Sequence, residues 1–75
     1  MDLRGTRVES ALEQLDRFLD RAALGDLTSV RIVHGVGTGA LRNALREHLA
    51  QHALVHSFTA EEGANTDGAT VVEMA

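Results

Sequence analysis

The fold is decided by residues 30–39, which read VRIVHGVGTG. The first half is rich in β-branched residues, so it predicts a strand over residues 30–34. Glycines at alternate positions, Gly35, Gly37 and Gly39, then predict a tight loop. A strand followed by a glycine-rich loop and a helix is typical of α/β proteins, which bind ligands at the carboxyl ends of their strands.

Two amphipathic helices flank this stretch. Apolar residues recur at helical spacing over residues 7–24, which predicts a helix with one buried face. They are Val8, Ala11, Leu12, Leu15, Phe18, Leu19 and Ala22. Thr6 and Glu9 predict a capping box at its start, and Gly25 predicts a left-handed end. Leucines at every fourth position predict a second helix over residues 40–51.

Three further strands complete the expected fold. Residues 55–60 and 69–74 predict a hairpin, because a polar loop over residues 61–68 joins two strand-like runs. Residues 2–4 are placed as a short strand before the first helix. The order β-α-β-α-β-β needs right-handed crossovers, which put both helices on one face of a four-stranded mixed sheet. The sequence therefore predicts an α/β (α+β) two-layer sandwich whose other face is open.

Composition narrows the class of protein. The chain has 75 residues, with 44% hydrophobic and 24% charged residues, which is typical of one globular domain. No cysteine is present, so disulfides, thiolate metal sites and cysteine nucleophiles are excluded. The sequence contains no membrane-spanning apolar run and no signal-peptide pattern, and we expect a cytoplasmic protein without a membrane partner.

The net charge of −4 argues against a broad basic surface for a polyanion. We expect a local basic patch instead, formed by Arg4, Arg31, Arg42 and Arg46, with most carboxylates on the first helix and in residues 61–67. Nucleic-acid affinity would then be modest.

His34 and the glycine loop are the first candidates for chemistry. Backbone N–H groups of such a loop, at the start of a helix, can hold a phosphate, although glycines also serve as simple turn formers. His34 can act as a general acid or base, or it can bond a neighbouring backbone group as an ordinary strand-end histidine. The residues alone leave both alternatives open.

Asp2 and Arg4 are the second candidates. If residues 2–4 pair in parallel with residues 30–34, Arg4 and His34 lie at the same end of the sheet, where a guanidinium would favour a bound phosphate. Asp2 and Arg4 can also simply pair with each other. His48 and His52 have a spacing that permits a metal site, but we interpret them as an exposed helix end and predict no metal site from the sequence.

These residues resemble the paired signatures of the Smr (small MutS-related) family. Asp2-Leu3-Arg4-Gly5 is similar to the first signature, and His34-Gly35-Val36-Gly37-Thr38-Gly39 to the second. The following Ala40-Leu41-Arg42 is most similar to the C-terminal Smr domain of the second bacterial MutS paralogue. The resemblance covers the whole chain, so residues 1–75 are interpreted as a single Smr domain, cut from the C-terminus of a larger protein.

The resemblance implies a fold similar to the C-terminal domain of the third bacterial initiation factor. It also implies a non-specific endonuclease that nicks DNA, or cleaves RNA in other members, within a parent protein acting in DNA repair or in suppression of recombination. The implied catalytic residues are Asp2, Arg4 and His34. The implied nucleic-acid-binding residues are Gly35, Gly37, Thr38, Gly39 and Arg42.

The roles implied are phosphate stabilisation for Arg4, proton transfer for His34 and orientation of a neighbour for Asp2. Val36 departs from the family, which often has a basic residue there, and this removes one phosphate contact. A divalent metal cofactor is left open. Two other functions also remain: a non-catalytic nucleic-acid or ribosome-binding module, and a protein-interaction appendage that uses the open sheet face.

Overall fold

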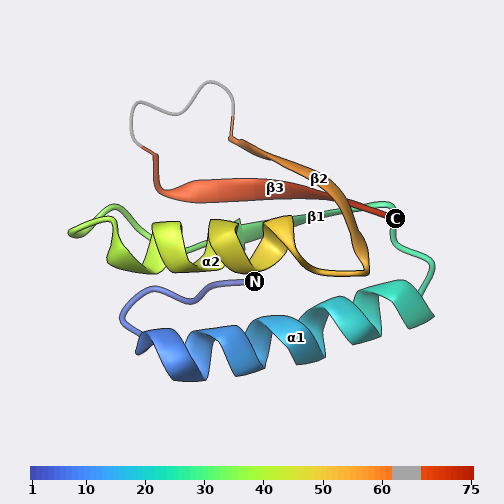
Figure 1. Ribbon diagram of the computed structural model, residues 1–75, viewed down its shortest axis with the longest axis horizontal. Coiled ribbons are helices and arrows are strands. Elements are labelled where there is room, and N and C mark those ends of the chain that lie inside the picture. The colour runs from blue at the N-terminus through green and yellow to red at the C-terminus, as the bar shows by residue number, and fades with distance from the viewer. Residues whose placement is uncertain (62–66) are drawn as a thin grey trace.

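The computed structural model describes residues 1–61 and 67–75 (Figure 1). Two helices and three strands follow one another along the chain. They are α1 (Val8–Leu24), β1 (Ser29–Val33), α2 (Ala40–Ala50), β2 (Val55–Ala60) and β3 (Ala69–Met74). Each bound lies within one residue of the sequence prediction. Within the described residues, neither helix combines the length and the apolar content needed to cross a membrane.

The three strands form an antiparallel sheet in the order β1-β3-β2. The predicted hairpin of β2 and β3 is confirmed, and a register shift between Val55 and Ser57 interrupts its ladder. β3 separates β1 from β2, which therefore run in the same direction without touching. The connection expected over residues 61–68 falls mostly on residues 62–66, which lie outside the described residues.

The N-terminal segment extends the sheet by only one residue pair, so the four-stranded mixed sheet is not confirmed. Asp2 forms a single parallel bridge with Val33. Two hydrogen bonds flank it, from Leu3 N to Val33 O (2.7 Å) and from Val33 N to Met1 O (2.8 Å). A turn ends the segment, because Thr6 N donates to Leu3 O (3.1 Å) and Gly5 has a φ of 77°.

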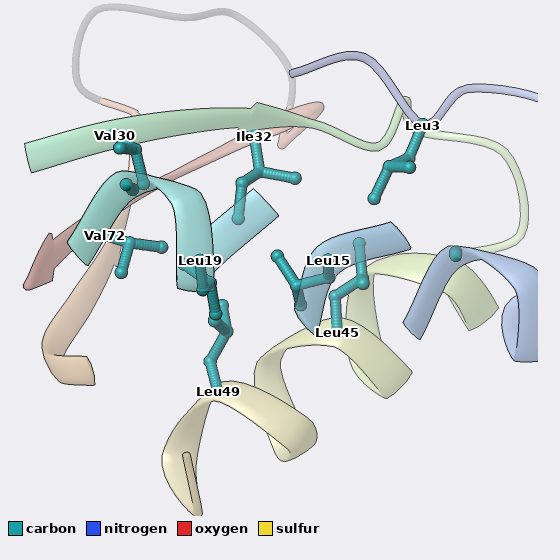
Figure 2. Packing of buried hydrophobic residues seen from close by; sticks show 10 residues of the cluster. Leu3, Leu15, Leu19, Val30, Ile32, Leu45, Leu49 and Val72 are labelled. Carbon is teal, nitrogen blue, oxygen red and sulfur yellow. The ribbon is translucent and has the colours of Figure 1, made fainter. Parts of the chain in front are cut away.

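Both helices lie on the same face of the sheet, as predicted (Figures 1 and 2). The core is one cluster to which every element except β2 contributes fully buried side chains. These include Leu3, Leu15, Leu19, Ile32, Leu45, Leu49 and Val72. Leu12 and Phe18 were expected in the stripe but are only partly buried at its margin. The buried face of α1 is centred on Leu15 and Leu19.

The ends of α1 differ from the sequence prediction. The N-cap residue is Arg7, which makes no side-chain capping bond, so the capping box predicted from Thr6 and Glu9 is wrong. The helix begins one residue too late for the Thr6 hydroxyl to cap it. Gly25 has a φ of −86°, and the left-handed residue is Asp26, with a φ of 56°.

The bonds at this C-terminus form a Schellman motif. Leu27 N donates to Ala22 O (3.0 Å), and Asp26 N donates to Ala23 O (3.1 Å). Asp26 occupies the position that glycine usually takes. An L-residue pays a steric cost there that glycine avoids.

Asp26→Gly is therefore expected to raise the free energy of unfolding by about 0.5–1 kcal/mol. The urea midpoint of the two proteins measures the difference. Asp20→Gly serves as the control, because the same change at an exposed position inside α1 should destabilise by a few tenths of a kcal/mol. A lower midpoint for Asp26→Gly would contradict the proposed strain.

Candidate functional site

The starts of the two helices border a common hollow. Its volume is about 300 Å³, and it is lined by residues 5–8 before and at the start of α1 and by residues 34–41, which lead into α2. The first N–H groups of a helix have no acceptor within the helix and carry partial positive charge. Two helix starts around one hollow therefore favour an anion such as a phosphate.

Two glycines allow arginine side chains to cross the loop closely. A Cβ atom on Gly35 would lie 3.2 Å from Cγ of Arg4, and one on Gly39 would lie 2.6 Å from Nη2 of Arg42. Both glycines also have positive φ angles, of 78° and 84°. The predicted juxtaposition of Arg4 with the loop is therefore confirmed. Nearby, Thr38 Oγ1 accepts a hydrogen bond from Ala40 N (3.3 Å) at the start of α2.

Arg4 is held by Asp2, the pairing that the sequence left open. Arg4 Nη2 donates to Asp2 Oδ2 (2.7 Å), and Arg4 Nε donates to both carboxylate oxygens (3.1 Å each). These side-chain hydrogen bonds are the main reason that the pKa of Asp2 is lowered to about 2. The side chain of Arg4 is still 66% exposed. Asp2 thus fixes a guanidinium that remains accessible beside the loop.

His34 is buried, with 4% of its surface exposed. Its Nδ1 lies 2.9 Å from Gly35 O, and its Nε2 lies 2.9 Å from Thr70 Oγ1. A carbonyl oxygen only accepts hydrogen bonds, so Nδ1 carries the proton, and in the neutral ring Nε2 accepts from the Thr70 hydroxyl. Proton transfer to a substrate would require one of these two bonds to open.

A network that sequence reasoning missed holds His34 in place. Arg46 Nε donates to Thr70 Oγ1 (3.0 Å), and its Nη1 and Nη2 donate to Asp67 (2.9 and 2.6 Å). The hydrogen bonds from Arg46 are the main cause of the lowered pKa of Asp67. The available signal was Thr70, a hydroxyl beside the apolar residues Ala69, Val71 and Val72 of β3.

The residue just before β3 also fixes the loop through its backbone. Gly68 O accepts hydrogen bonds from His34 N (3.1 Å) and Gly35 N (3.0 Å). Residues 67–70, far from the loop in the sequence, therefore set its position.

The basic patch is neutralised more than the sequence predicted. Arg4 pairs with Asp2, Arg31 with Glu61, and both Arg42 and Arg46 with Asp67. The expectation that carboxylates lie away from these arginines is wrong, because Glu61 and Asp67 flank the hairpin at the same edge as the loop. Sequence reasoning also missed Arg7, which lines the hollow. Counted over the described residues alone, these five arginines and the three carboxylates Asp2, Glu61 and Asp67 have a local formal charge of +2.

The other histidine pair lies elsewhere. His48, in the last turn of α2, and His52, just beyond the end of that helix, lie beside Asp16 of α1. Within residues 1–61 and 67–75, these three side chains are the one group with the proximity needed to hold a metal ion.

Comparison with known proteins shows the family of the chain. The family model described as the Smr domain matches residues 1–75, the whole chain. The chain belongs to the Smr family. This Smr domain is 49% identical over 75 residues to the Endonuclease MutS2 of Leuconostoc mesenteroides, covering 99% of the chain and 9% of that protein. It is 47% identical over 76 residues to the Endonuclease MutS2 of Listeria welshimeri, covering 97% and 9%.

Solved structures share its fold. The Smr domain of Thermus thermophilus MutS2 superposes with a TM-score of 0.93 at 43% identity, covering 100% of this chain and 95% of that one. YdaL, a stand-alone small MutS-related protein from Escherichia coli, gives a TM-score of 0.87 at 23% identity, covering 99% and 62%. The second likeness shows the fold alone. The Smr domain spans about a tenth of the length of the MutS2 relatives it matches.

Proposed function

We propose that this Smr domain is an endonuclease that nicks DNA without sequence specificity, as part of a MutS-related protein in DNA repair or suppression of recombination. The observation that carries the proposal is the position of Arg4, which is exposed and passes close to Gly35, a residue of the hollow between the two helix starts. Arg4 itself lines a neighbouring hollow that also includes Gly35 and Val36. The naming of its MutS2 relatives as endonucleases supports the same reaction class.

Arg4 stabilises the scissile phosphate in this proposal. Its guanidinium favours the bound anion and the extra negative charge that develops as the phosphodiester is attacked. Asp2 orients Arg4 through the paired hydrogen bonds. The N–H groups of residues 36–38 bind phosphate oxygens, because those of Gly35 and Gly39 already donate to Gly68 O and Val36 O. The two glycines let the loop approach the phosphate closely, and Thr38 and Arg42 lie beside it at the start of α2.

His34 acts as a positioning residue. It is buried and both its ring nitrogens are engaged, so it holds the carbonyl of Gly35 and thereby the shape of the loop. This differs from the proton transfer that the family resemblance implies. A misplacement of catalytic groups by about 1 Å can lower a rate by about 10², so a positioning role is compatible with a large effect on catalysis.

The alternative is a non-catalytic module that docks on nucleic acid or a ribosome. Two observations favour it: four of the arginines near the loop are paired with carboxylates, and the one histidine of the loop is buried. The isolated domain has a modest affinity for nucleic acid in either case, because its local charge is small. The other domains of the parent protein would contribute most of the binding affinity.

Incubation of the purified domain with supercoiled plasmid separates the two functions. The proposal predicts open-circular product, and the alternative predicts binding without it. An RNA of the same length as a DNA substrate tests whether the domain also cleaves RNA. The described contacts at the loop do not indicate a metal requirement. The reaction is therefore run once with divalent ions and once with a chelator, to show whether nicking needs a metal.

His34→Gln is expected to lower the single-turnover nicking rate by about 10², because the loop loses its internal support. Thr70→Val is the matched variant, since it keeps the imidazole but removes the hydroxyl bound to Nε2. Both variants should lose rate without a change in the shape of the pH profile. If Thr70→Val nicks at the parental rate while His34→Gln does not, His34 transfers protons and the positioning role is wrong.

A further inference from the structure

We propose that Asp16, His48 and His52 form a binding site for a late first-row transition-metal ion such as Zn²⁺. The site lies between α1 and α2, away from the glycine loop, and it does not depend on the proposed nuclease function. Two imidazoles and one carboxylate are a donor set that zinc and its neighbours prefer, whereas Mg²⁺ and Ca²⁺ prefer oxygen ligands.

The ligand atoms already converge. Asp16 Oδ1 lies 2.7 Å from His48 Nε2 and 3.2 Å from His52 Nε2. All three residues place a ligand atom within 4.8 Å of the other two. Tetrahedral zinc, with bonds of about 2.0 Å, keeps its ligand atoms about 3.3 Å apart. Separations of this size require only small side-chain movements to admit the ion.

The helices fix the positions of the three ligands. His48 is in the last turn of α2, and His52 follows just beyond the end of the helix at Ala50. The ring centroids are 5.8 Å apart and the planes meet at 65°. Asp16 belongs to α1, which packs against α2 through Leu15 and Leu45 in the same core. The ion would therefore link two helices that are already fixed.

Room exists for the remaining ligands. A hollow of about 510 Å³ is lined by Asp16, Asp20, His48 and His52, together with Gln51 and Ala53. Asp20 is one turn from Asp16 on α1 and can approach as a fourth ligand, or water can complete the coordination. An open position of this kind is typical of zinc bound by three protein ligands.

Two hydrogen bonds oppose metal binding. Leu54 N donates to His52 Nδ1 (3.1 Å), which places the proton of the neutral ring on Nε2. A metal on Nε2 moves that proton to Nδ1, so Leu54 N loses its acceptor. The ion also replaces the hydrogen bond between His48 Nε2 and Asp16 Oδ1 (2.7 Å), with both atoms becoming its ligands. The Leu54 amide reports directly on the exchange at His52.

Calorimetric titration of the tag-free domain with zinc chloride tests the proposal. We expect one zinc ion per chain, no response to magnesium chloride, and a changed NMR position for the Leu54 amide. His48→Asn and Asp16→Asn should each weaken zinc binding by at least about tenfold. His56→Asn is the control, because His56 is an exposed histidine outside the group.

Circular dichroism shows whether each variant is folded, and Asp16→Asn keeps the size of the partly exposed side chain that it replaces. The proposal is overturned if the wild-type domain binds no zinc, or if His48→Asn and Asp16→Asn bind it as tightly as the wild type. A loss of binding in His56→Asn equal to that in His48→Asn also overturns it, because binding would then be a property of surface histidines in general.

Discussion

Leu45→Ala is expected to lower the free energy of unfolding by about 2–5 kcal/mol. Leu45 is fully buried on α2, where it meets α1 and the sheet in a single cluster (Figure 2). Removing its side chain leaves a cavity that a thin two-layer core fills poorly. A domain of this length has a total stability of only about 4–11 kcal/mol, so urea unfolding should show a large shift of the midpoint.

Leu12→Ala is the matched comparison. The sequence places Leu12 in the apolar stripe of α1 as firmly as it places Leu45 in α2, but the structure leaves Leu12 only partly buried. The loss for Leu12→Ala should therefore be clearly smaller than for Leu45→Ala. Equal losses would show that the core is not centred where the structure puts it.

Arg4→Ala is expected to lower the single-turnover nicking rate by about 10²–10³, the usual effect of removing one group that stabilises transition-state charge. Affinity for DNA should fall as well, because the same guanidinium favours the bound phosphate. The rate is measured by conversion of supercoiled to open-circular plasmid at fixed salt. Equilibrium binding is measured on the same preparations.

Arg17→Ala is the control for a simple loss of positive charge. Arg17 is exposed on α1, outside the hollow that the loop borders. It should nick at a rate close to that of the wild type. If Arg4→Ala and Arg17→Ala lose activity equally, the loss of rate is due to long-range electrostatics. Arg4 would then make no specific contact with the phosphate.

The helices and β1 could be predicted because each has a strong local period, and β2 and β3 because a polar loop joins two strand-like runs. The leucines of α2 recur every fourth residue, and β1 alternates buried Val30 and Ile32 with exposed Arg31. The ends of α1 were harder to predict, because Thr6 and Gly25 each fit a capping pattern that the chain does not use. The helix begins after Arg7, which makes no side-chain capping bond, and the left-handed residue at its end is Asp26. The likeness to the third bacterial initiation factor stays a prediction.

The location of the candidate site could be predicted from the sequence, but the hydrogen-bond and ion-pair partners of its residues could not. A parallel bridge between Asp2 and Val33 was enough to bring Arg4 beside Gly35, as the expected pairing implied. The partners of Arg46 and His34 come from the start of β3, more than twenty residues away in the sequence. No local pattern reports such contacts, so the burial of His34 could not be foreseen.

The central claim, that the loop and Arg4 cleave DNA rather than only hold it, is tested most directly by single-turnover nicking at saturating domain concentration. Saturation removes differences in affinity, so the measured rate reports on the chemical step alone. The account predicts open-circular plasmid with the wild-type domain and a rate lower by about 10² or more with Arg4→Ala. Saturated binding by the wild-type domain without any nicked product, whether or not divalent metal is present, would contradict it.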